Sequence, residues 1–389
     1  MTLKSPFLMI RSDAAGLATI QVVNRHLCVV RMVQIAAVLA VVALAACTSS
    51  TAPSTTSSSS GSPQPSPKLT TYTAADFATA LAWAPDKRLF YAERSGTIRT
   101  FDGTTRHTFA TVSTSTEGER GLLGLAISPT FDKDHFVYAF YSRADDLTRQ
   151  RVVRWLDRDG IGTNVTTIID NLPAGPDCCH KGGRIAFGPD GKLYVTMGEN
   201  HMAAEAQNTA SLRGKILRYN PDGTVPDDNP FGRGNPVWAI GLRNPFGLAF
   251  SPDGKLLVTD NGPSGDAGTP GSGWDEVDLV VRGGNYQWPT CFGDGRHLQG
   301  LYCVGSLPTW QSGSEDVVPT GATFVSQKGP SGYQGTFVFC SYSEARLKVM
   351  SSDGTRPLFD GPRCQLDVKE GPDHALYLSD TSSIYRFGP

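Results

Sequence analysis

A tight turn followed by a short strand of alternating character recurs along the chain from residue 69 onward. Most copies open with proline, and two read Pro-Asp-Gly. Proline sets the first dihedral of such a turn, and Asp-Gly completes the reversal that leads into a strand. The expected strands are Arg88–Ala92, His135–Ala139, Lys192–Thr196, Lys255–Thr259 and Ala375–Ser379, with Gly335–Cys340 as a copy that lacks the turn.

The spacing of these copies predicts the architecture. Successive turn prolines lie 44, 60, 63 and 120 residues apart, and the last gap holds one further copy. Short strands at this period, without an amphipathic helix of three turns, favour an all-β fold, a β-propeller. We expect six blades, with seven as the alternative. A jelly roll or a sandwich would not explain the recurrence.

The N-terminal part is expected to direct export. Ile35–Ala46 is an unbroken apolar run, shorter than a membrane-spanning helix and typical of a signal peptide. It ends in Leu-Ala-Ala before Cys47, which resembles a bacterial lipobox. We therefore predict a lipoprotein signal peptide over residues 1–46 and a lipid-anchored protein on the extracellular or periplasmic face. An ordinary signal peptide followed by a chance cysteine is the alternative.

Composition divides the rest of the chain in two. Residues 47–68 are almost entirely Ser, Thr, Pro and Gly after Cys47, which predicts a disordered linker. The propeller is expected over residues 69–389. The formal net charge of the whole chain is −2, so a basic nucleic-acid surface is not expected.

Cysteine usage agrees with export, because six cysteines fall within the expected propeller. Cys291 and Cys303 would close a short loop, and Cys340 and Cys364 could join neighbouring strands. The adjacent pair at 178 and 179 could bond to each other or stay free. Zinc binding is disfavoured, since no Cys-x-x-Cys or histidine cluster accompanies them.

Loops that follow blade strands hold the candidate functional residues. His180 precedes two glycines, where backbone can approach a ligand closely, and imidazole is a common general base near neutral pH. Glu199, at the end of the next strand, could orient that imidazole. A histidine satisfied within a tight loop and a solvated strand end are the alternatives.

Two further stretches carry polar groups in apolar surroundings. Arg243 and Asn244 adjoin within one of them, and the guanidinium offers a planar donor fork for a carboxylate or quinone oxygen. An arginine that joins two blades is the alternative. The segments 260–263, 274–276 and 283–289 supply carboxylate, amide and carbonyl oxygens of the kind that calcium binds, or else form a glycine-rich loop without an ion.

Taken in order, these stretches resemble the soluble quinoprotein glucose/sorbosone dehydrogenase family, which includes aldose sugar dehydrogenases and the propeller of hedgehog-interacting protein. The matching strings are ERGLLGLAISPTF (119–131), HKGGRIAFGPDGKLYVTMGE (180–199), LRGKILRYNPDGTVPDDNPF (212–231), GLRNPFGLAF (241–250), DNGP (260–263) and GGNYQWP (283–289).

The resemblance implies a six-bladed propeller that binds pyrroloquinoline quinone (PQQ) and calcium and oxidises a sugar or polyol to the lactone. It implies the following roles: His180 as the base, Glu199 as its supporting carboxylate, Arg243 and Asn244 as cofactor contacts with Asn261 beside them, the Gly262 and Pro263 carbonyls as calcium ligands, and Glu276 with the Tyr286 carbonyl at a further calcium site.

Cations toward the C-terminus depart from the family pattern. The family places a lysine in the fifth blade and Arg-x-Arg before the last, and the latter positions here are Cys364 and Leu366. We therefore expect that Arg363, Arg346 or Lys348 meets the carboxylates of PQQ, or else that PQQ binds weakly or not at all. Two other functions remain open: a non-catalytic propeller that binds a glycan or a protein, and a lactonase-type hydrolase.

Overall fold

The computed structural model describes residues 66–265, 271–297, 303, 307–351, 353–354 and 357–389. The predicted signal peptide, Cys47 and nearly all of the predicted linker lie outside these residues. Among the helices of the described part, none is long and apolar enough to cross a membrane.

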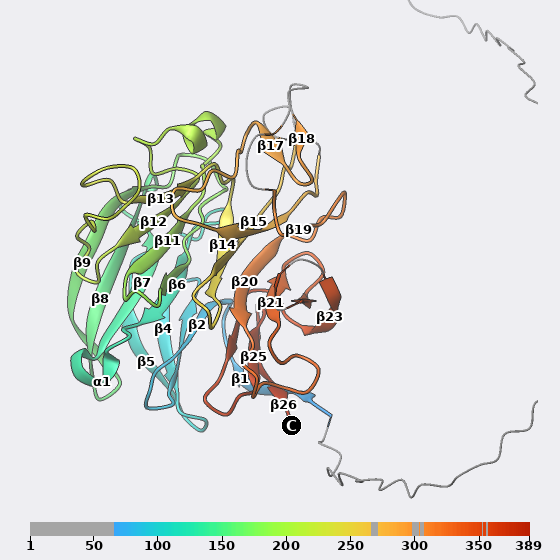
Figure 1. Cartoon of the computed structure of the whole chain (residues 1–389). Coiled ribbons are helices and arrows are strands. Elements are labelled where there is room, and N and C mark those ends of the chain that lie inside the picture. Colours follow the sequence, from blue (N-terminus) through green and yellow to red (C-terminus); the bar gives the residue numbers. More distant parts are fainter. Residues whose placement is uncertain (1–65, 266–270, 298–302, 304–306, 352, 355–356) are drawn as a thin grey trace, which may run out of the picture. The chain divides into compact units, whose positions relative to one another are not determined.

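Six four-stranded antiparallel sheets make up the fold (Figure 1), and we number them as blades 1 to 6 along the chain. Blade 1 consists of β2 (Ala78–Trp83), β3 (Leu89–Glu93), β4 (Thr97–Phe101) and β5 (Arg106–Thr111). Blade 2 consists of β6 (Leu122–Ile127), β7 (Phe136–Ser142), β8 (Arg149–Arg158) and β9 (Ile161–Pro173). Blade 3 consists of β10 (Ile185–Phe187), β11 (Leu193–Met197), β12 (Lys215–Tyr219) and β13 (Val237–Ile240).

Blade 4 consists of β14 (Pro245–Phe250), β15 (Leu256–Asp260), β16 (Glu276–Val280) and β19 (Trp310–Gln311). Blade 5 consists of β20 (Pro319–Phe324), β21 (Phe337–Ser341), β22 (Arg346–Met350) and β23 (Pro357–Arg363). Blade 6 consists of β24 (Val368–Glu370), β25 (Leu376–Ser379), β26 (Ser383–Gly388) and β1 (Lys68–Ala74). A hairpin, β17 (Cys291–Phe292) and β18 (Arg296–His297), projects from blade 4, and the described helices are α1 (Phe131–Asp134) and the 3-10 turn η1 (Ala203–Gln207).

The first strands of the blades form a closed ring. Contacts run from β2 to β6, β10, β14, β20 and β24 in turn, and β24 contacts β2 again. The sequence-based prediction of a six-bladed, all-β propeller is therefore confirmed, and the seven-bladed alternative is wrong.

Each turn-and-strand copy found in the sequence became the second strand of a blade, β3, β7, β11, β15, β21 or β25. The turn before β11 shows why: Gly191 has φ of 71° and donates its N–H to the Gly188 carbonyl. Glycine reaches this left-handed conformation at little steric cost. The motif thus reverses the chain between the first two strands of a blade.

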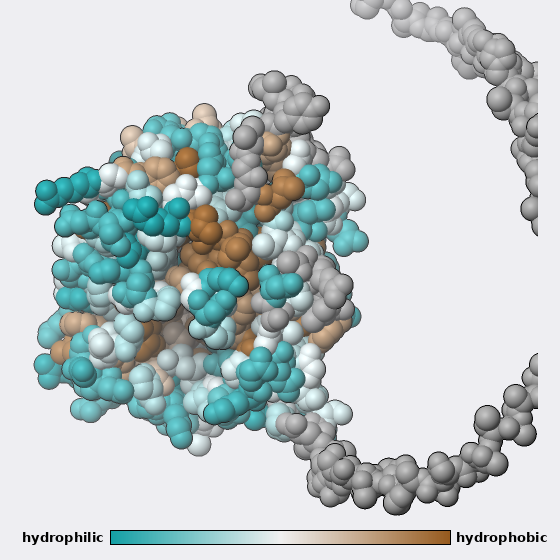
Figure 2. All heavy atoms as spheres, viewed as in Figure 1, coloured by the Kyte–Doolittle hydropathy of each residue, from teal (hydrophilic) through white to brown (hydrophobic). Residues whose placement is uncertain are grey.

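Apolar side chains fill the spaces between neighbouring blades, and each adjacent pair shares one buried cluster. Phe140 on β7, for example, is fully buried and packs with β11 and β12 of the next blade. Figure 2 shows the outer surface on this side as largely hydrophilic, with an apolar patch near the middle of the view. Burial between blades therefore holds the ring together.

The last blade takes one strand from each end of the described chain. β1 pairs with β26 from Lys68 opposite Gly388 to Ala74 opposite Ser383, and Figure 1 shows the blue β1 beside the red β26. Lys68, the last residue of the predicted linker, is already part of this strand.

Three disulfides join the six cysteines of the propeller. Cys291 bonds to Cys303 and Cys340 to Cys364, as the sequence suggested. Cys364 follows β23, so its bond spans blade 5 rather than adjacent strands. Cys178 bonds to its neighbour Cys179, which resolves the alternative left open by the sequence.

Candidate active site

All six blades contribute to one cavity of about 700 Å³ at an end of the ring axis. This volume lies within the range of small-molecule pockets. Its described lining includes six of the residues singled out in the sequence, His180, Arg243, Asn244, Asn261, Gly262 and Pro263.

His180 and Glu199 form a buried pair at this cavity. Nδ1 of His180 contacts Oε1 of Glu199, and both side chains are buried. Because a carboxylate can only accept, Nδ1 carries the proton and Nε2 keeps a lone pair. The pairing therefore fixes the tautomer of a potential base.

Close backbone approach makes this pair possible. Glu199 follows β11, and a Cβ on Gly198 would lie 2.1 Å from the His180 carbonyl oxygen, so only glycine fits there. Asn200 donates its side-chain N–H to the same carbonyl at 2.6 Å. The loop after β11 is thus held against the backbone of His180.

Arg243 lies at the start of blade 4 with its guanidinium in the cavity wall. It donates to the Asn261 carbonyl at 3.1 Å and to Ser264 Oγ at 2.6 Å, and it lies over the Trp288 ring. Asn244, the next residue, accepts the Gly182 N–H at 3.1 Å. The Arg-Asn pair therefore connects the loops of blades 3 and 4.

Oxygen atoms gather beside Arg243. Gly262 and Pro263 line the cavity, and the Gly262 N–H donates to Asp275 at 2.8 Å. Asn261 Oδ1 is buried and accepts no hydrogen bond within the described chain. An unsatisfied buried oxygen beside two further backbone carbonyls, those of Gly262 and Pro263, suits a hard cation such as calcium.

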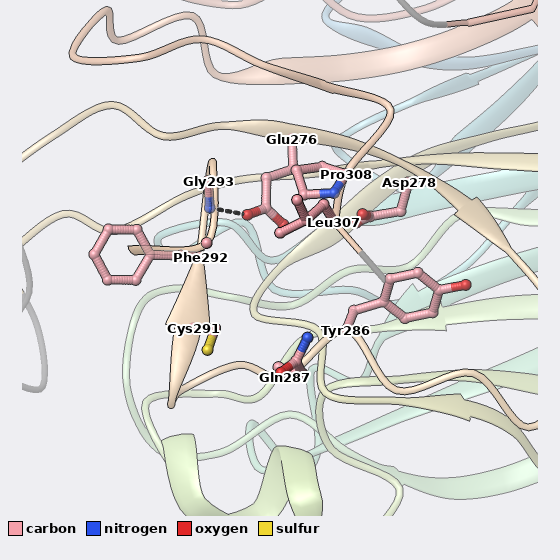
Figure 3. Close-up of a pocket in the computed structure, with 10 residues that line it drawn as sticks. Glu276, Asp278, Tyr286, Gln287, Cys291, Phe292, Gly293, Leu307 and Pro308 are labelled. Atoms are coloured by element: carbon pink, nitrogen blue, oxygen red, sulfur yellow. Dashed lines mark hydrogen bonds between the residues drawn. The ribbon is translucent and has the colours of Figure 1, made fainter. Parts of the chain in front are cut away.

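A second, smaller site lies between β16 and the β17–β18 hairpin, and Figure 3 shows Glu276 and Asp278 there. Asp260, Glu276 and Asp278 are buried, and each has a carboxylate oxygen within 4.8 Å of the other two. Asp260 lies opposite Glu276 in the β15–β16 ladder, and Asp278 projects from the same face of β16 two residues on. A hollow of about 10 Å³, room for one ion or water, adjoins Glu276, Asp278 and Tyr286.

The charges of this acidic cluster are poorly tolerated without a cation. Burial raises the pKa of Asp260 to about 7. Burial, and then the charge of neighbouring carboxylates, raises the pKa of Glu276 and of Asp278 well above the usual range. Asp278 Oδ2 is buried and has no hydrogen-bond partner in the described part of the chain. A divalent ion would relieve both costs.

Arg363, the cation that the sequence favoured for cofactor carboxylates, does not line the cavity. Its Nε donates to Asp380 at 2.5 Å, and its side chain is 51% exposed. Lys348 instead pairs with Glu344 at 2.6 Å and Asp360 at 3.0 Å, and Arg346 is exposed on β22. None of the three proposed substitutes reaches the site.

Sequence reasoning missed two arginines that line the cavity, Arg94 and Arg184. Arg184 is buried against the Phe246 ring and donates to the Leu366 carbonyl at 2.8 Å. Arg94 donates to the Thr116 carbonyl at 2.8 Å. Arg184 lies within the string 180–199, so its place in that motif was the signal available, whereas Arg94 follows β3 outside every matching string.

The lining fits PQQ and calcium. Arg94, Arg184 and Arg243 are among the residues that line the cavity and can meet the carboxylates of PQQ, and Arg184 also pairs with the buried Asp367 at 3.5 Å. Carbonyl oxygens at Gly262 and Pro263 suit a cation beside a quinone.

Comparisons with known proteins agree with this geometry. The family model described as Glucose / Sorbosone dehydrogenase matches residues 75–385. A quinoprotein glucose dehydrogenase B of Acinetobacter calcoaceticus is 32% identical over 55% of this chain and 50% of its own length, so this chain spans half of that relative.

Two further similarities cover most of the chain. An aldose sugar dehydrogenase of Escherichia coli is 29% identical over 79% of this chain and 88% of its own. The PQQ-bound structure of an aldose sugar dehydrogenase from Streptomyces coelicolor is 28% identical with a TM-score of 0.70, covering 84% of this chain and 99% of that one. With its propeller, its cavity and this match over nearly the whole described region, the chain belongs to the glucose/sorbosone dehydrogenase family.

Proposed function

We propose that this protein is a PQQ- and calcium-dependent dehydrogenase that oxidises an aldose sugar or related alcohol to the lactone. The observation that carries the proposal is the meeting of the His180–Glu199 pair with Arg243 on one cavity. Family membership and the PQQ-bound relative support the choice of cofactor.

The residues divide the work as follows. Nε2 of His180 takes the proton of the substrate hydroxyl, and Glu199 keeps the imidazole in the required tautomer. Arg243 and Asn244 would hold PQQ, with Arg94 and Arg184 as further cations. When bound, PQQ supplies a two-electron acceptor for the hydride of the substrate.

Calcium is proposed at two places. The carbonyls of Gly262 and Pro263, with Asn261 beside them, would hold an ion that polarises a quinone oxygen. Glu276, Asp278 and the Tyr286 carbonyl would hold a second ion in the hollow of Figure 3.

We also propose that the protein acts outside the cytoplasm, anchored through lipid on Cys47. The disulfides of the propeller support an oxidising compartment. Expression with a radiolabelled fatty acid tests the anchor: label is expected in the wild type and absent from Cys47→Ser.

Reconstitution with PQQ and calcium tests the activity. Reduction of an artificial electron acceptor is measured across a panel of aldoses, with His180→Asn in parallel. Turnover that needs PQQ and is lost in His180→Asn supports the proposal. Absence of both turnover and PQQ binding favours a binding propeller, and lactone hydrolysis without PQQ favours a lactonase.

A further inference from the structure

A line of four side chains runs from the buried carboxylate of Glu199, past the proposed base His180, toward solvent. It begins at Glu199, continues through His180 and His201, and ends at Asp177. Their side-chain exposures rise in this order, at 0%, 5%, 32% and 55%. The imidazole rings of His180 and His201 meet edge to face, with centroids 4.2 Å apart. Nδ1 of His201 lies 3.6 Å from Oδ2 of Asp177.

His201 is held in this place by an unusual backbone. Asn200 and His201 both have positive φ, at 56° and 58°. A histidine in this region is uncommon, and such conformations persist where the surrounding structure enforces them, often at functional sites. The Asn200 side chain provides that constraint, because it is bonded to the His180 carbonyl at 2.6 Å.

The vicinal disulfide lies between two members of the line. Cys178 and Cys179 separate Asp177 from His180 in the sequence, and their bond closes a small covalent ring. The Cys178 carbonyl accepts the Glu119 N–H at 2.8 Å, and Lys181 Nζ donates to the Asp177 carbonyl at 2.7 Å. The disulfide and these bonds restrict how far Asp177 can move from His180.

We propose that His201 is a proton-relay residue, which with Asp177 carries the proton taken up by His180 out to water. The inference rests on the proposed function, because it concerns the proton that the oxidation releases. In each turnover the hydroxyl proton passes to His180, and the hydride, with its electron pair, leaves for the quinone. His180 then gives its proton to His201, which passes it to water beside Asp177, and both imidazoles return to neutral.

The surroundings suit this role. Glu199 and His201 face the ring of His180, and Asp177 and His180 face the ring of His201. Imidazole gains and loses a proton readily near neutral pH. Nδ1 of His180 is engaged by Glu199, so the proton taken up at Nε2 must leave on the cavity side, where His201 lies.

The test compares His201→Ala with a matched control, His374→Ala, in protein reconstituted with PQQ and calcium. His374 also pairs with a carboxylate, Glu370, at 2.8 Å and is 42% exposed, but it is not among the residues that line the cavity. In weak buffer, turnover of His201→Ala is expected to fall by about 10²-fold, at the low end of acid–base effects. The KM and the affinity for PQQ stay unchanged.

Added imidazole buffer should restore turnover of His201→Ala, and the solvent deuterium isotope effect of that variant should rise above that of the wild type. His374→Ala should show neither effect. If His201 had only a structural role, added imidazole would not restore turnover and the isotope effect would not rise. Wild-type turnover with unchanged kinetics in His201→Ala would overturn the relay and leave the proposed function standing.

A readout without catalysis covers the case in which the wild type oxidises no sugar and the proposed function fails. Exchange of the labile ring protons of His180 with water, followed by nitrogen-15 NMR, should slow by about tenfold in His201→Ala and less in Asp177→Asn. Equal exchange in the wild type and His201→Ala would overturn the relay whatever the activity.

Discussion

The Asp260 carboxylate accepts the backbone N–H of Asn244 at 2.6 Å. It also accepts the Arg243 N–H at 2.9 Å, so one side chain fixes the backbone of both proposed cofactor contacts. The same carboxylate belongs to the buried acidic cluster with Glu276 and Asp278. An ion in the cluster would therefore act on the cavity through Asp260.

Calcium should stabilise the fold through this cluster. An ion present at 100 times its Kd adds about 2.7 kcal/mol to the free energy of unfolding. We expect chelation to lower the Tm of the wild type and to weaken PQQ binding, and Asp278→Asn to lose most of the calcium-dependent rise in Tm. The exposed Asp253→Asn serves as control. A Tm independent of calcium would contradict the second metal site.

Glu199→Gln keeps the size of the side chain and removes its charge. Because the amide no longer stabilises the protonated imidazole of His180, kcat should fall by about 10²-fold or more. PQQ affinity, measured by fluorescence titration, should change little. The exposed Glu315→Gln should retain wild-type kcat, and an equal loss in both variants would argue against the specific pair.

Packing between blades can be measured at Phe140, which is fully buried between blades 2 and 3. Phe140→Ala should lower the free energy of unfolding by about 3–5 kcal/mol in urea titrations, since it leaves a cavity in the core. Phe359→Ala, at an exposed position, should lower the free energy of unfolding much less. Similar losses at both positions would refute the blade-to-blade core.

The Cys340–Cys364 bond closes a loop within blade 5, and both cysteines are fully buried. Replacing both by alanine should reduce the free energy of unfolding by about 2–4 kcal/mol, because the unfolded chain gains freedom. Thermal unfolding under non-reducing conditions measures the effect. Reductant opens the other two disulfides in both proteins, so the wild type and the variant should converge when both are reduced, and equal stability without reductant would contradict the prediction.

Lys215 should give the stability a distinct pH dependence. Its amine is fully buried and donates to the Glu205 and Ala206 carbonyls at 2.7 and 2.8 Å. Burial lowers the pKa of Lys215 from its ordinary 10.5 to about 7. Below pH 7 the Lys215 amine is protonated in both the folded and the unfolded chain. The folded state then bears the whole free-energy cost of burying a charged amine.

Between pH 7 and about 10.5 the unfolded chain binds more protons at this site, so stability should rise with pH. The wild type should therefore gain stability relative to Lys215→Met across this interval, as measured by urea unfolding at several pH values. Parallel curves for the two proteins would contradict the assignment.

Local turn chemistry made the ring predictable, because a proline-led turn precedes the second strand of five of the six blades. The place of β1 was not predicted, because nothing in the sequence of residues 68–74 alone indicates that they pair with β26. Asp278 was missed for a similar reason. It lies within a strand that otherwise holds Glu276, Val and Leu, and only the β15–β16 ladder places it near Asp260.

Motif positions located part of the cavity lining, since consecutive loops of a propeller end on the same face. The prediction that Arg363 contacts the cofactor was wrong. It rested on counting positions along the chain, whereas the Arg363 guanidinium is bonded to Asp380 outside the cavity. His201 follows Glu199 by only two residues, yet its contact with His180 depends on left-handed backbone that composition does not reveal.

The pairing of β1 with β26 has a mechanical consequence. Any force that pulls on the chain ahead of Lys68 is borne first by this ladder, whose first pair is Lys68 and Gly388. Peeling β1 away would strip blade 6 of its outer strand, while the contact of β24 with β2 would still close the inner ring. Resistance to stretching therefore resides in a handful of backbone hydrogen bonds at the point where the two ends of the described chain meet.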